Sequence, residues 1–171
     1  AVNWRGCSGE PNLLARSYHS GASEDLAAAV AHLRTQHPTA PLFAVGYSLG
    51  GNVLLKYLGE SGAGSGLQGA VAVSVPFRLD QCADRIGQGF SKVYQAHFMR
   101  EMLAYLKDKH RQFQHDSRQE ALTALAKIGA IKTLGKMRTF WEFDDKVTAP
   151  LNGYLNVDDY YRRASSRYFL G

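Results

Sequence analysis

Apolar and polar positions follow two kinds of pattern in the first part of the chain. Residues 41–47 and 67–76 are short apolar runs near glycine and proline, which predicts buried strands. Residues 23–37 and 49–59 place apolar side chains three or four positions apart, which predicts helices with one face against a sheet. Residues 1–5 read as the end of a further strand. Because strands and helices alternate, we predict an α/β fold with a parallel sheet and crossover helices.

The first predicted helix has recognisable ends. Ser23 is a good N-cap, and Glu24 and Asp25 then lie in the first turn, where carboxylates complement the positive end of the helix dipole. The helix should end near His37 and Pro38, because a proline disfavours the helical conformation of the residue before it.

The pattern becomes mostly helical after residue 79. Residues 90–112 are predicted to form one amphipathic helix, and residues 117–128 and 157–169 two shorter ones. The apolar stripe of the long helix recurs at steps of three and four: Phe90, Val93, Tyr94, Phe98, Met102, Tyr105 and Leu106.

Composition places the chain among globular proteins. Its 171 residues, of which 45% are hydrophobic and 20% charged, are enough to bury one core. No apolar run approaches the roughly 20 residues that span a bilayer, and the first residues lack the layout of a secretion signal. Cys7 and Cys82 have no spacing typical of a metal site or a disulfide framework. We therefore expect a reduced, cytoplasmic setting.

The formal charge of +5 is unevenly distributed. Residues 121–140 contain basic side chains and no acidic ones: Lys127, Lys132, Lys136 and Arg138. Such a surface can attract phosphates or anionic lipid head groups. Because no nucleic-acid-binding motif accompanies the charge, we favour a solvated helix face and expect no nucleic-acid partner.

Residues 46–50 read Gly-Tyr-Ser-Leu-Gly, where the apolar run meets the second helix. A strand that turns sharply into a helix forces the residue at the turn toward strained backbone angles. Side chains two positions before and two after Ser48 would collide in such a turn, and Gly46 and Gly50 remove them. This is the G-x-S-x-G pattern of a nucleophile elbow, which projects the serine hydroxyl above the sheet.

The residue after the serine adds a hydrogen-bond donor. Leu49 opens the helix, so its backbone N–H can donate to a developing oxyanion close to the positive end of the helix dipole. Gly51 would let this helix pack closely against its neighbours. The alternative interpretation is a plain glycine-rich turn, or one that binds a phosphate. The strand and helix patterns on either side favour the elbow.

With these motifs, the sequence resembles the α/β-hydrolase superfamily and, within it, the YheT-type hydrolases, which are related to the lung-type α/β-hydrolases. The resemblance covers most of the chain. It is carried by the stretches NWRGCSGEPN, YHSGASED, AVGYSLGGNVLLKYL, VSVPF, GFSKVYQ, FWEFDDKVTAPLNGY and DDYYRRAS.

The resemblance implies a serine carboxylesterase or acylglycerol lipase with Ser48 as the nucleophile. It also implies a partial α/β-hydrolase fold, in which residues 1–79 form a core with the elbow, residues 80–150 a helical cap, and residues 151–171 a helix after the cap. Two stretches look like cap and post-cap motifs without a matched catalytic role, Phe143-Asp144-Asp145 and Tyr160-Tyr161.

Part of the family's catalytic machinery is not visible in the sequence. The chain order of the triad is Ser, then Asp or Glu, then His, with the acid and the histidine after later strands, and neither strand is predicted here. A glycine-rich oxyanion loop, commonly beginning His-Gly, is also absent. We therefore expect these residues to be an internal part of a longer hydrolase, with the triad Asp and His not in this chain and negligible activity of the chain alone.

Other titratable side chains are given structural interpretations. His97, His110 and His115, with Asp80 and Asp84, could form an improvised triad, but they follow no strand end, and catalytic placement requires close support from the scaffold.

His19 is expected to be hydrogen-bonded in a loop, and Cys7 to be a turn residue. Asp144 and Asp145 could imitate an acid–base pair. Neighbours on a strand point to opposite faces, however, so we expect a hydrogen-bonding or capping role for them.

The sequence thus predicts a hydrolase of carboxylic esters that works through an acyl-enzyme at Ser48 and acts on a small-molecule ester or lipid. No metal or organic cofactor is implied. Phe90, Tyr94, Phe98 and Met102 are candidates for an acyl pocket or for ordinary core packing. Two alternatives stay open: a non-catalytic remnant or interaction protein of the same descent, and an acyltransferase in which an alcohol or amine replaces water. The oligomeric state is also left open.

Overall fold

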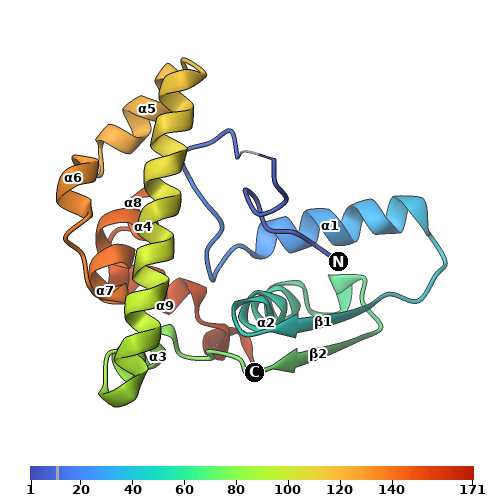
Figure 1. Ribbon diagram of the computed structural model, residues 1–171. Coiled ribbons are helices and arrows are strands. Elements are labelled where there is room, and N and C mark those ends of the chain that lie inside the picture. The colour runs from blue at the N-terminus through green and yellow to red at the C-terminus, as the bar shows by residue number, and fades with distance from the viewer. Residues whose placement is uncertain (11) are drawn as a thin grey trace. The chain divides into compact units, whose positions relative to one another are not determined.

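The computed structural model describes residues 1–10 and 12–171; Pro11 and the side chain of Lys132 lie outside the described part. The chain divides into two compact units. We call residues 1–4, 18–79 and 161–171 the sheet unit, and residues 5–17 and 80–160 the helical unit (Figure 1). The parallel sheet with its crossover helix confirms the predicted α/β class and is consistent with a partial α/β-hydrolase fold.

The sheet unit is built on two parallel strands joined by a crossover. β1 (Phe43–Tyr47) pairs with β2 (Gly69–Val73), with Val45 opposite Val71. α2 (Leu49–Ser61) forms the crossover, as the sequence predicted. Both strands lie inside the predicted apolar runs, and both are shorter than those runs.

The first helix, α1 (Ser23–Gln36), has His37 as its C-cap, close to the predicted end, and carries two carboxylates in its first turn. The predicted N-cap is wrong by one residue, because Ala22 occupies the cap position and Ser23 is already helical. The Ser23 hydroxyl instead donates to Oε2 of Glu60 in α2 at 2.6 Å. A long-range hydrogen bond thus takes the hydroxyl that a local cap would have used.

The core of the sheet unit lies on α2. Its apolar residues Val53, Leu54 and Tyr57 are buried, as predicted. The C-terminal residues also pack here. Gly59 has no room for a Cβ beside Phe169, so the helix requires glycine at this position.

One strand prediction is wrong. Residues 1–4 have no regular structure, and residue 5 lies in a turn. A short stretch with three apolar residues cannot by itself distinguish a strand end from an extended loop, because strand formation depends on a neighbouring strand.

The predicted burial of the two strands is also wrong. Residues paired across parallel strands point to the same side, and one side of this sheet is open. On the other side, Gly46 lies directly against the backbone of α2. The exposed sheet face consists of Phe43 (70% exposed), Val45, Tyr47, Val71 and Val73.

The helical unit contains most of the remaining helices. These are α3 (Leu79–Ile86), α4 (Lys92–His115), α5 (Gln119–Ala126), α6 (Ile131–Leu134), α7 (Phe140–Phe143), α8 (Ala149–Leu151) and α9 (Val157–Ala164), of which α3 begins and α9 ends in the sheet unit. A π-helical turn covers Asp144–Thr148, and 3-10 turns cover Gly62–Ser65, Gly89–Ser91 and Ser166–Phe169. The predicted helices over 90–112 and 117–128 correspond to α4 and α5, and the predicted helix over 157–169 to α9 and a 3-10 turn.

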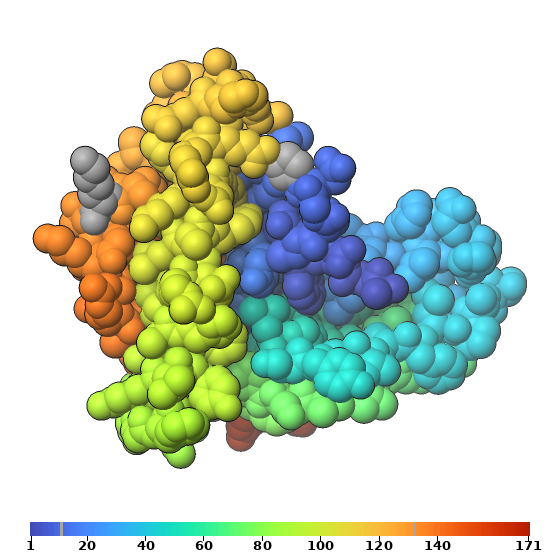
Figure 2. Space-filling model, in the orientation of Figure 1, coloured from blue at the N-terminus to red at the C-terminus, as the bar shows by residue number. Residues whose placement is uncertain are grey.

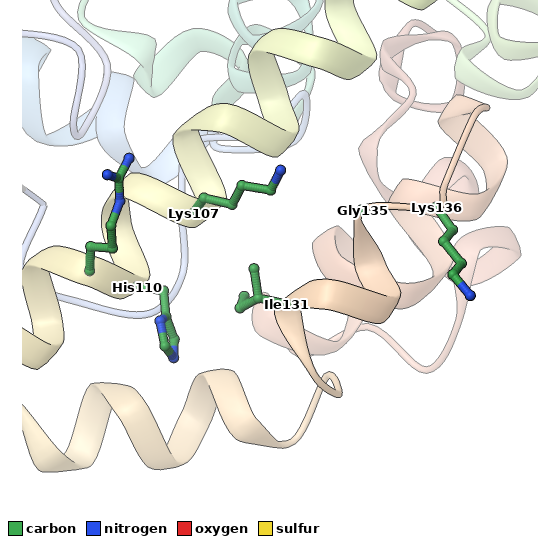
Figure 3. A pocket seen from close by; sticks show the side chains of 6 residues that line it. Lys107, His110, Ile131, Gly135 and Lys136 are labelled. Carbon is green, nitrogen blue, oxygen red and sulfur yellow. The ribbon is translucent and has the colours of Figure 1, made fainter.

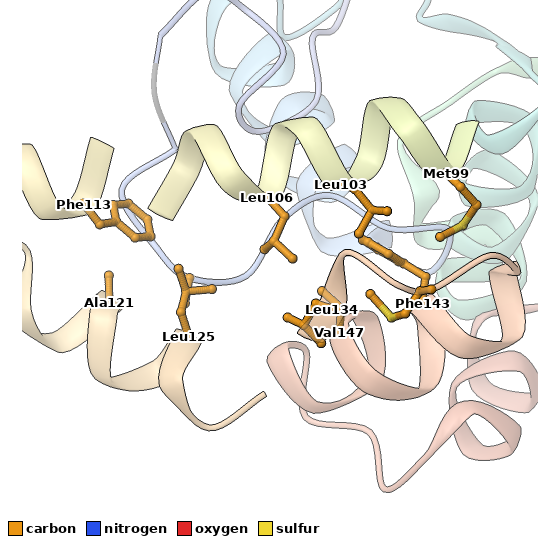
Figure 4. Packing of buried hydrophobic residues seen from close by; sticks show 11 residues of the cluster. Met99, Leu103, Leu106, Phe113, Ala121, Leu125, Leu134, Phe143 and Val147 are labelled. Carbon is orange, nitrogen blue, oxygen red and sulfur yellow. The ribbon is translucent and has the colours of Figure 1, made fainter. Parts of the chain in front are cut away.

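This unit has a hydrophobic core of its own (Figure 4). Side chains of α4 point toward those of α5 and of the segment around α7. Phe113 and Leu125 are each 1% exposed, so the contact between α4 and α5 is closed to water. The cluster comprises Ala15, Met99, Leu103, Leu106, Phe113, Ala121, Leu125, Leu134, Met137, Phe143 and Val147.

The apolar stripe predicted for α4 is only partly the stripe that is buried. Leu106 belongs to the core and Met102 packs against it, but four stripe residues are exposed: Phe90 (79%), Val93 (60%), Tyr94 (57%) and Phe98 (46%). Figure 2 shows that one side of α4, coloured yellow-green to yellow, is open to view along most of its length. The prediction failed because α4 carries a second apolar stripe, and packing against α5 and the segment around α7 selects that one.

A buried lysine connects residues 5–17 to α4. Lys109 is 5% exposed, and its Nζ donates to the carbonyl oxygen of Arg16 at 2.8 Å and to the hydroxyl of Ser17 at 3.0 Å. Burial, and secondarily the charge of Arg5, lowers the pKa of Lys109 from 10.5 to about 8.

Candidate active site

Ser48 is the single residue between the end of β1 and the first residue of α2. Its backbone angles are φ 50° and ψ −119°, in a region that non-glycine residues rarely adopt. The side chain is exposed, and the Ser48 N–H donates to the carbonyl oxygen of Val73 at 2.9 Å. The chain therefore changes from strand to helix in one strained residue, while β2 holds its backbone.

The glycines around Ser48 permit this turn, but not in the way the sequence argument supposed. A Cβ on Gly46 would lie 2.5 Å from the carbonyl oxygen of Gly50, so residue 46 meets backbone and not a side chain. A Cβ on Gly51 would lie 2.8 Å from Val75 Cγ2 and 3.0 Å from the Gly46 carbonyl oxygen. At Gly50 the nearest atom would be 3.9 Å away, on Trp4. The steric requirement thus falls on Gly46 and Gly51, and Gly50 has room for a side chain.

The start of α2 offers hydrogen-bond donors. Leu49 is the first helical residue, and the first N–H groups of a helix have no acceptor within it. Ser48 occupies the N-cap position, yet its side chain makes no capping hydrogen bond. The hydroxyl is consequently not engaged by the helix that it precedes.

Asn52, one turn into α2, is a site residue that the sequence argument missed. It is 0% exposed, and its amide nitrogen donates to the carbonyl oxygens of Ser20 and Ala164, both at 2.8 Å. Its amide oxygen accepts from the Ser166 N–H at 2.9 Å. These bonds hold the loop at Ser20, the end of α9 and the 3-10 turn after it against the first turns of α2. An asparagine in a helical pattern gives no local sign of this role, because its partners are 32 to 114 positions away.

Ser74 is a second residue that the sequence did not single out. It directly follows β2, is exposed, and has φ 53°. The carboxyl ends of parallel strands meet at one edge of a sheet, so Ser48 and Ser74 are strained serines at the same edge. Strained non-glycine residues are frequent at functional sites, which makes Ser74 a candidate contact for a substrate.

The candidate triad residues later in the chain are in the helical unit. His97, His110 and His115 all belong to α4. His97 contacts Arg100, with 3.0 Å between the ring Nδ1 and Nη2, and His115 contacts the carboxylate of Asp116 at 2.9 Å. Within the described part of the chain, no hydrogen bond joins any of them to Ser48.

His19 has the structural role expected of it. It is buried, and its Nδ1 accepts from the Gly21 N–H at 3.1 Å.

Asp144 and Asp145 do not lie on a strand, so that premise was wrong; both are in the π-helical turn. Asp144 accepts from the Thr148 hydroxyl at 2.6 Å, and Asp145 accepts from the N–H of Val157 at the start of α9 at 3.2 Å. Their roles are the hydrogen bonding and capping that we expected.

The two cysteines are free thiols. Burial raises the pKa of Cys7, and burial together with the charge of Asp80 raises the pKa of Cys82, so both favour the unreactive protonated form. Among the described residues, no group of three or more histidine, cysteine or acidic side chains could hold a metal ion. None of the described helices combines the length and the apolar character needed to cross a membrane.

Comparison with known proteins gives this geometry a family context. The family described as "Serine aminopeptidase, S33" matches residues 3–143. No solved structure matches the chain.

Three curated relatives match nearly the whole chain. "Putative esterase YheT" of Escherichia coli K12 is 38% identical over 165 residues, which is 96% of this chain and 46% of that protein. Human "Phospholipase ABHD3" is 30% identical over 95% of this chain and 37% of its own length. "Monoacylglycerol lipase" of Saccharomyces cerevisiae is 30% identical over 96% and 35%, respectively. The chain thus spans less than half the length of these relatives.

Proposed function

The chain belongs to the S33 serine aminopeptidase family of the α/β-hydrolase superfamily, and from this premise we propose that Ser48 is the nucleophile of an enzyme that hydrolyses carboxylic esters. The observation that carries the proposal is the geometry of Ser48. The exposed Ser48 is a strained residue between strand and helix, and its side chain makes no capping hydrogen bond to the described part of α2. Residues held in such strained backbone regions cluster at active sites.

We propose the following chemistry for the Ser48 hydroxyl and the Leu49 N–H. The Ser48 oxygen attacks the ester carbonyl carbon, and the carbonyl oxygen gains negative charge. The N–H of Leu49, at the positive end of α2, donates to that oxygen and lowers the energy of the tetrahedral intermediate. The alcohol then leaves, and water releases the acyl group from the serine.

A serine hydroxyl is a weak nucleophile unless a histidine removes its proton and an acid orients the histidine. The described residues do not bring such a pair to Ser48, so the proposal requires that a histidine and an acid reach it from elsewhere. The relatives, with more than twice the length, have room for such residues.

The substrate class is proposed from the names of the relatives. One relative is named a putative esterase, one a phospholipase and one a monoacylglycerol lipase, names that refer to esters and to lipids. We therefore propose a glycerol-based lipid or a simpler ester as the substrate, in preference to a peptide.

The test compares two proteins: the product of the complete reading frame that encodes these residues, and the 171-residue chain. The complete product should hydrolyse p-nitrophenyl esters and monoacylglycerols, and Ser48→Ala should lower kcat/KM by about a thousandfold or more. The matched control, Ser8→Ala at another exposed serine, should leave kcat/KM unchanged. The chain alone should show negligible turnover.

Either of two results would overturn the proposal. Undiminished turnover in Ser48→Ala would assign the chemistry to another residue. Absence of turnover in the complete product, with the Ser48 hydroxyl intact, would favour a non-catalytic remnant.

A further inference from the structure

The helical unit contains a pocket that the proposed ester chemistry does not use. The pocket has a volume of about 530 Å³ and lies between α4 and the segment around α6 (Figure 3). Its lining residues are Lys107, His110, Arg111, Ile131, Gly135 and Lys136. Three of these six are lysine or arginine, a fourth is histidine, and none of the described residues adds a carboxylate to the lining.

The positive charge of the pocket is only partly neutralised. Arg111 pairs with Asp108, which lies on the same helix outside the lining. Neither Lys107 nor Lys136 forms an ion pair with another described residue. Arg138 adds charge next to the lining, and its guanidinium donates to the carbonyl oxygen of Gly135 at 3.1 Å. The pocket therefore offers an anion the ammonium groups of Lys107 and Lys136, and none of its described lining residues is a carboxylate that would compete with the anion for them.

The lining offers an anion the side chains of two lysines and an arginine beside the apolar side chain of Ile131. In Figure 3, Lys107 extends from α4 toward the side of Gly135, with Ile131 beside it, whereas Lys136 extends outward. Lys136 is exposed, so its flexible chain can turn toward a ligand without loss of packing. A phosphate group accepts several such charge-assisted hydrogen bonds at once.

We propose that this pocket binds a phosphate group through Lys107, Lys136 and Arg111. The sequence showed only a run of basic residues over 121–140, for which we favoured a solvated helix face. The structure separates that run: Lys136 is among the residues that line the pocket, and Lys127 is not. The proposal is independent of Ser48, because every residue that it uses lies in the helical unit.

A phosphate group can belong to a membrane lipid or to a soluble molecule, and the experiment separates the two. Titration calorimetry of the 171-residue chain with inorganic phosphate and with glycerol 3-phosphate tests the soluble source. Flotation with vesicles of phosphatidylcholine, with and without phosphatidic acid, tests the lipid source. Binding in either arm identifies that source, provided that the variants respond as follows.

Lys107→Ala and Lys136→Ala should each weaken phosphate binding by about tenfold, the cost of one charge-assisted hydrogen bond. The matched control is Lys127→Ala, which removes the same charge from an exposed position outside the pocket and should leave binding within about twofold. Circular dichroism should be unchanged in all three variants, since each side chain is exposed.

Two outcomes would overturn the proposal. If Lys127→Ala weakens binding as much as Lys107→Ala does, the effect is that of net charge and not of a pocket. If the unmodified chain binds neither the soluble phosphates nor the phosphatidic acid vesicles, the pocket is not a phosphate site.

Discussion

The helical unit and the sheet unit bury their apolar residues to very different degrees. In the helical unit, Phe113 and Leu125 are closed to water inside a continuous cluster. In the sheet unit, α2 covers one side of the sheet, while Phe43 and Tyr47 on the other side are about 70% exposed. Burial of Phe113 thus stabilises the helical unit, whereas Phe43 and Tyr47 contribute little burial to the sheet unit.

The comparison separates two causes of an apolar pattern. In α4, the buried stripe is apolar because neighbouring helices pack on it within the described structure. On the exposed sheet face, the apolar pattern indicates a preference for burial that the described residues do not satisfy, since parallel sheets are normally covered on both sides. The free energy of unfolding should therefore depend on the buried stripe of α4 and be insensitive to the apolar residues of the exposed sheet face.

The largest expected effect is on the core of the helical unit. Phe113→Ala should lower the free energy of unfolding by about 3–5 kcal/mol, because it leaves a cavity between α4 and α5. Denaturant unfolding of the 171-residue chain, followed by circular dichroism, measures it. The matched variant Phe43→Ala on the exposed sheet face should cost less than about 1 kcal/mol. Equal losses in the two variants would mean that the sheet face is buried in solution.

The next effect depends on pH and concerns Lys109. Its folded-state pKa of about 8 is below the ordinary 10.5, so the unfolded chain binds more protons between these values and stability should rise with pH across that window. The full gain is about 3 kcal/mol, from about 1.4 kcal/mol for each pH unit. Unfolding curves from pH 7 to 9.5 should show the rise, and Lys109→Met should remove it. A rise that survives in Lys109→Met would assign it to another group.

A smaller effect tests the turn at Ser48. Gly46→Ala should destabilise the chain by about 1–3 kcal/mol, because the added methyl group meets the backbone of Gly50. Gly50→Ala should be neutral or stabilising by up to about 1 kcal/mol, since the site has room and alanine favours a helix. Thermal unfolding of the two variants measures the difference. The reverse ranking would show that the elbow is packed differently.

The smallest effect concerns two strained serines, one in each unit. Ser74 and Ser117 have φ of 53° and 54°, and glycine adopts such angles without strain. Ser74→Gly and Ser117→Gly should each raise stability by up to about 1 kcal/mol. If Ser74 also contacts a substrate, Ser74→Gly should raise KM in the complete product, whereas Ser117→Gly should not. Identical kinetics for both variants would leave Ser74 with a purely conformational role.

The elements that sequence could predict are those whose causes are local. The strand within residues 41–47, the helix after Ser48 and the helix that ends near His37 each follow from neighbouring residues, and the structure contains all three. The parallel pairing of the two strands followed from the crossover helix between them.

What sequence could not predict depends on distant partners. The choice between two apolar stripes on α4 is made by α5 and the segment around α7, and the strained Ser48 needs the carbonyl group of Val73. Asn52 acts through partners far away in the chain, and the pocket of the helical unit is lined by residues of α4 and of the segment around α6. These features are contacts between elements, and a pattern within one element does not contain them.

The central claim is that Ser48 is the reactive group, and covalent capture tests it most directly. A fluorophosphonate should be added to the complete product, followed by trypsin digestion and mass spectrometry. Our account predicts one adduct, on the peptide of residues 35–56, in which Ser48 is the only serine, and its loss in Ser48→Ala. An adduct on any other peptide, or one that persists in Ser48→Ala, would contradict it.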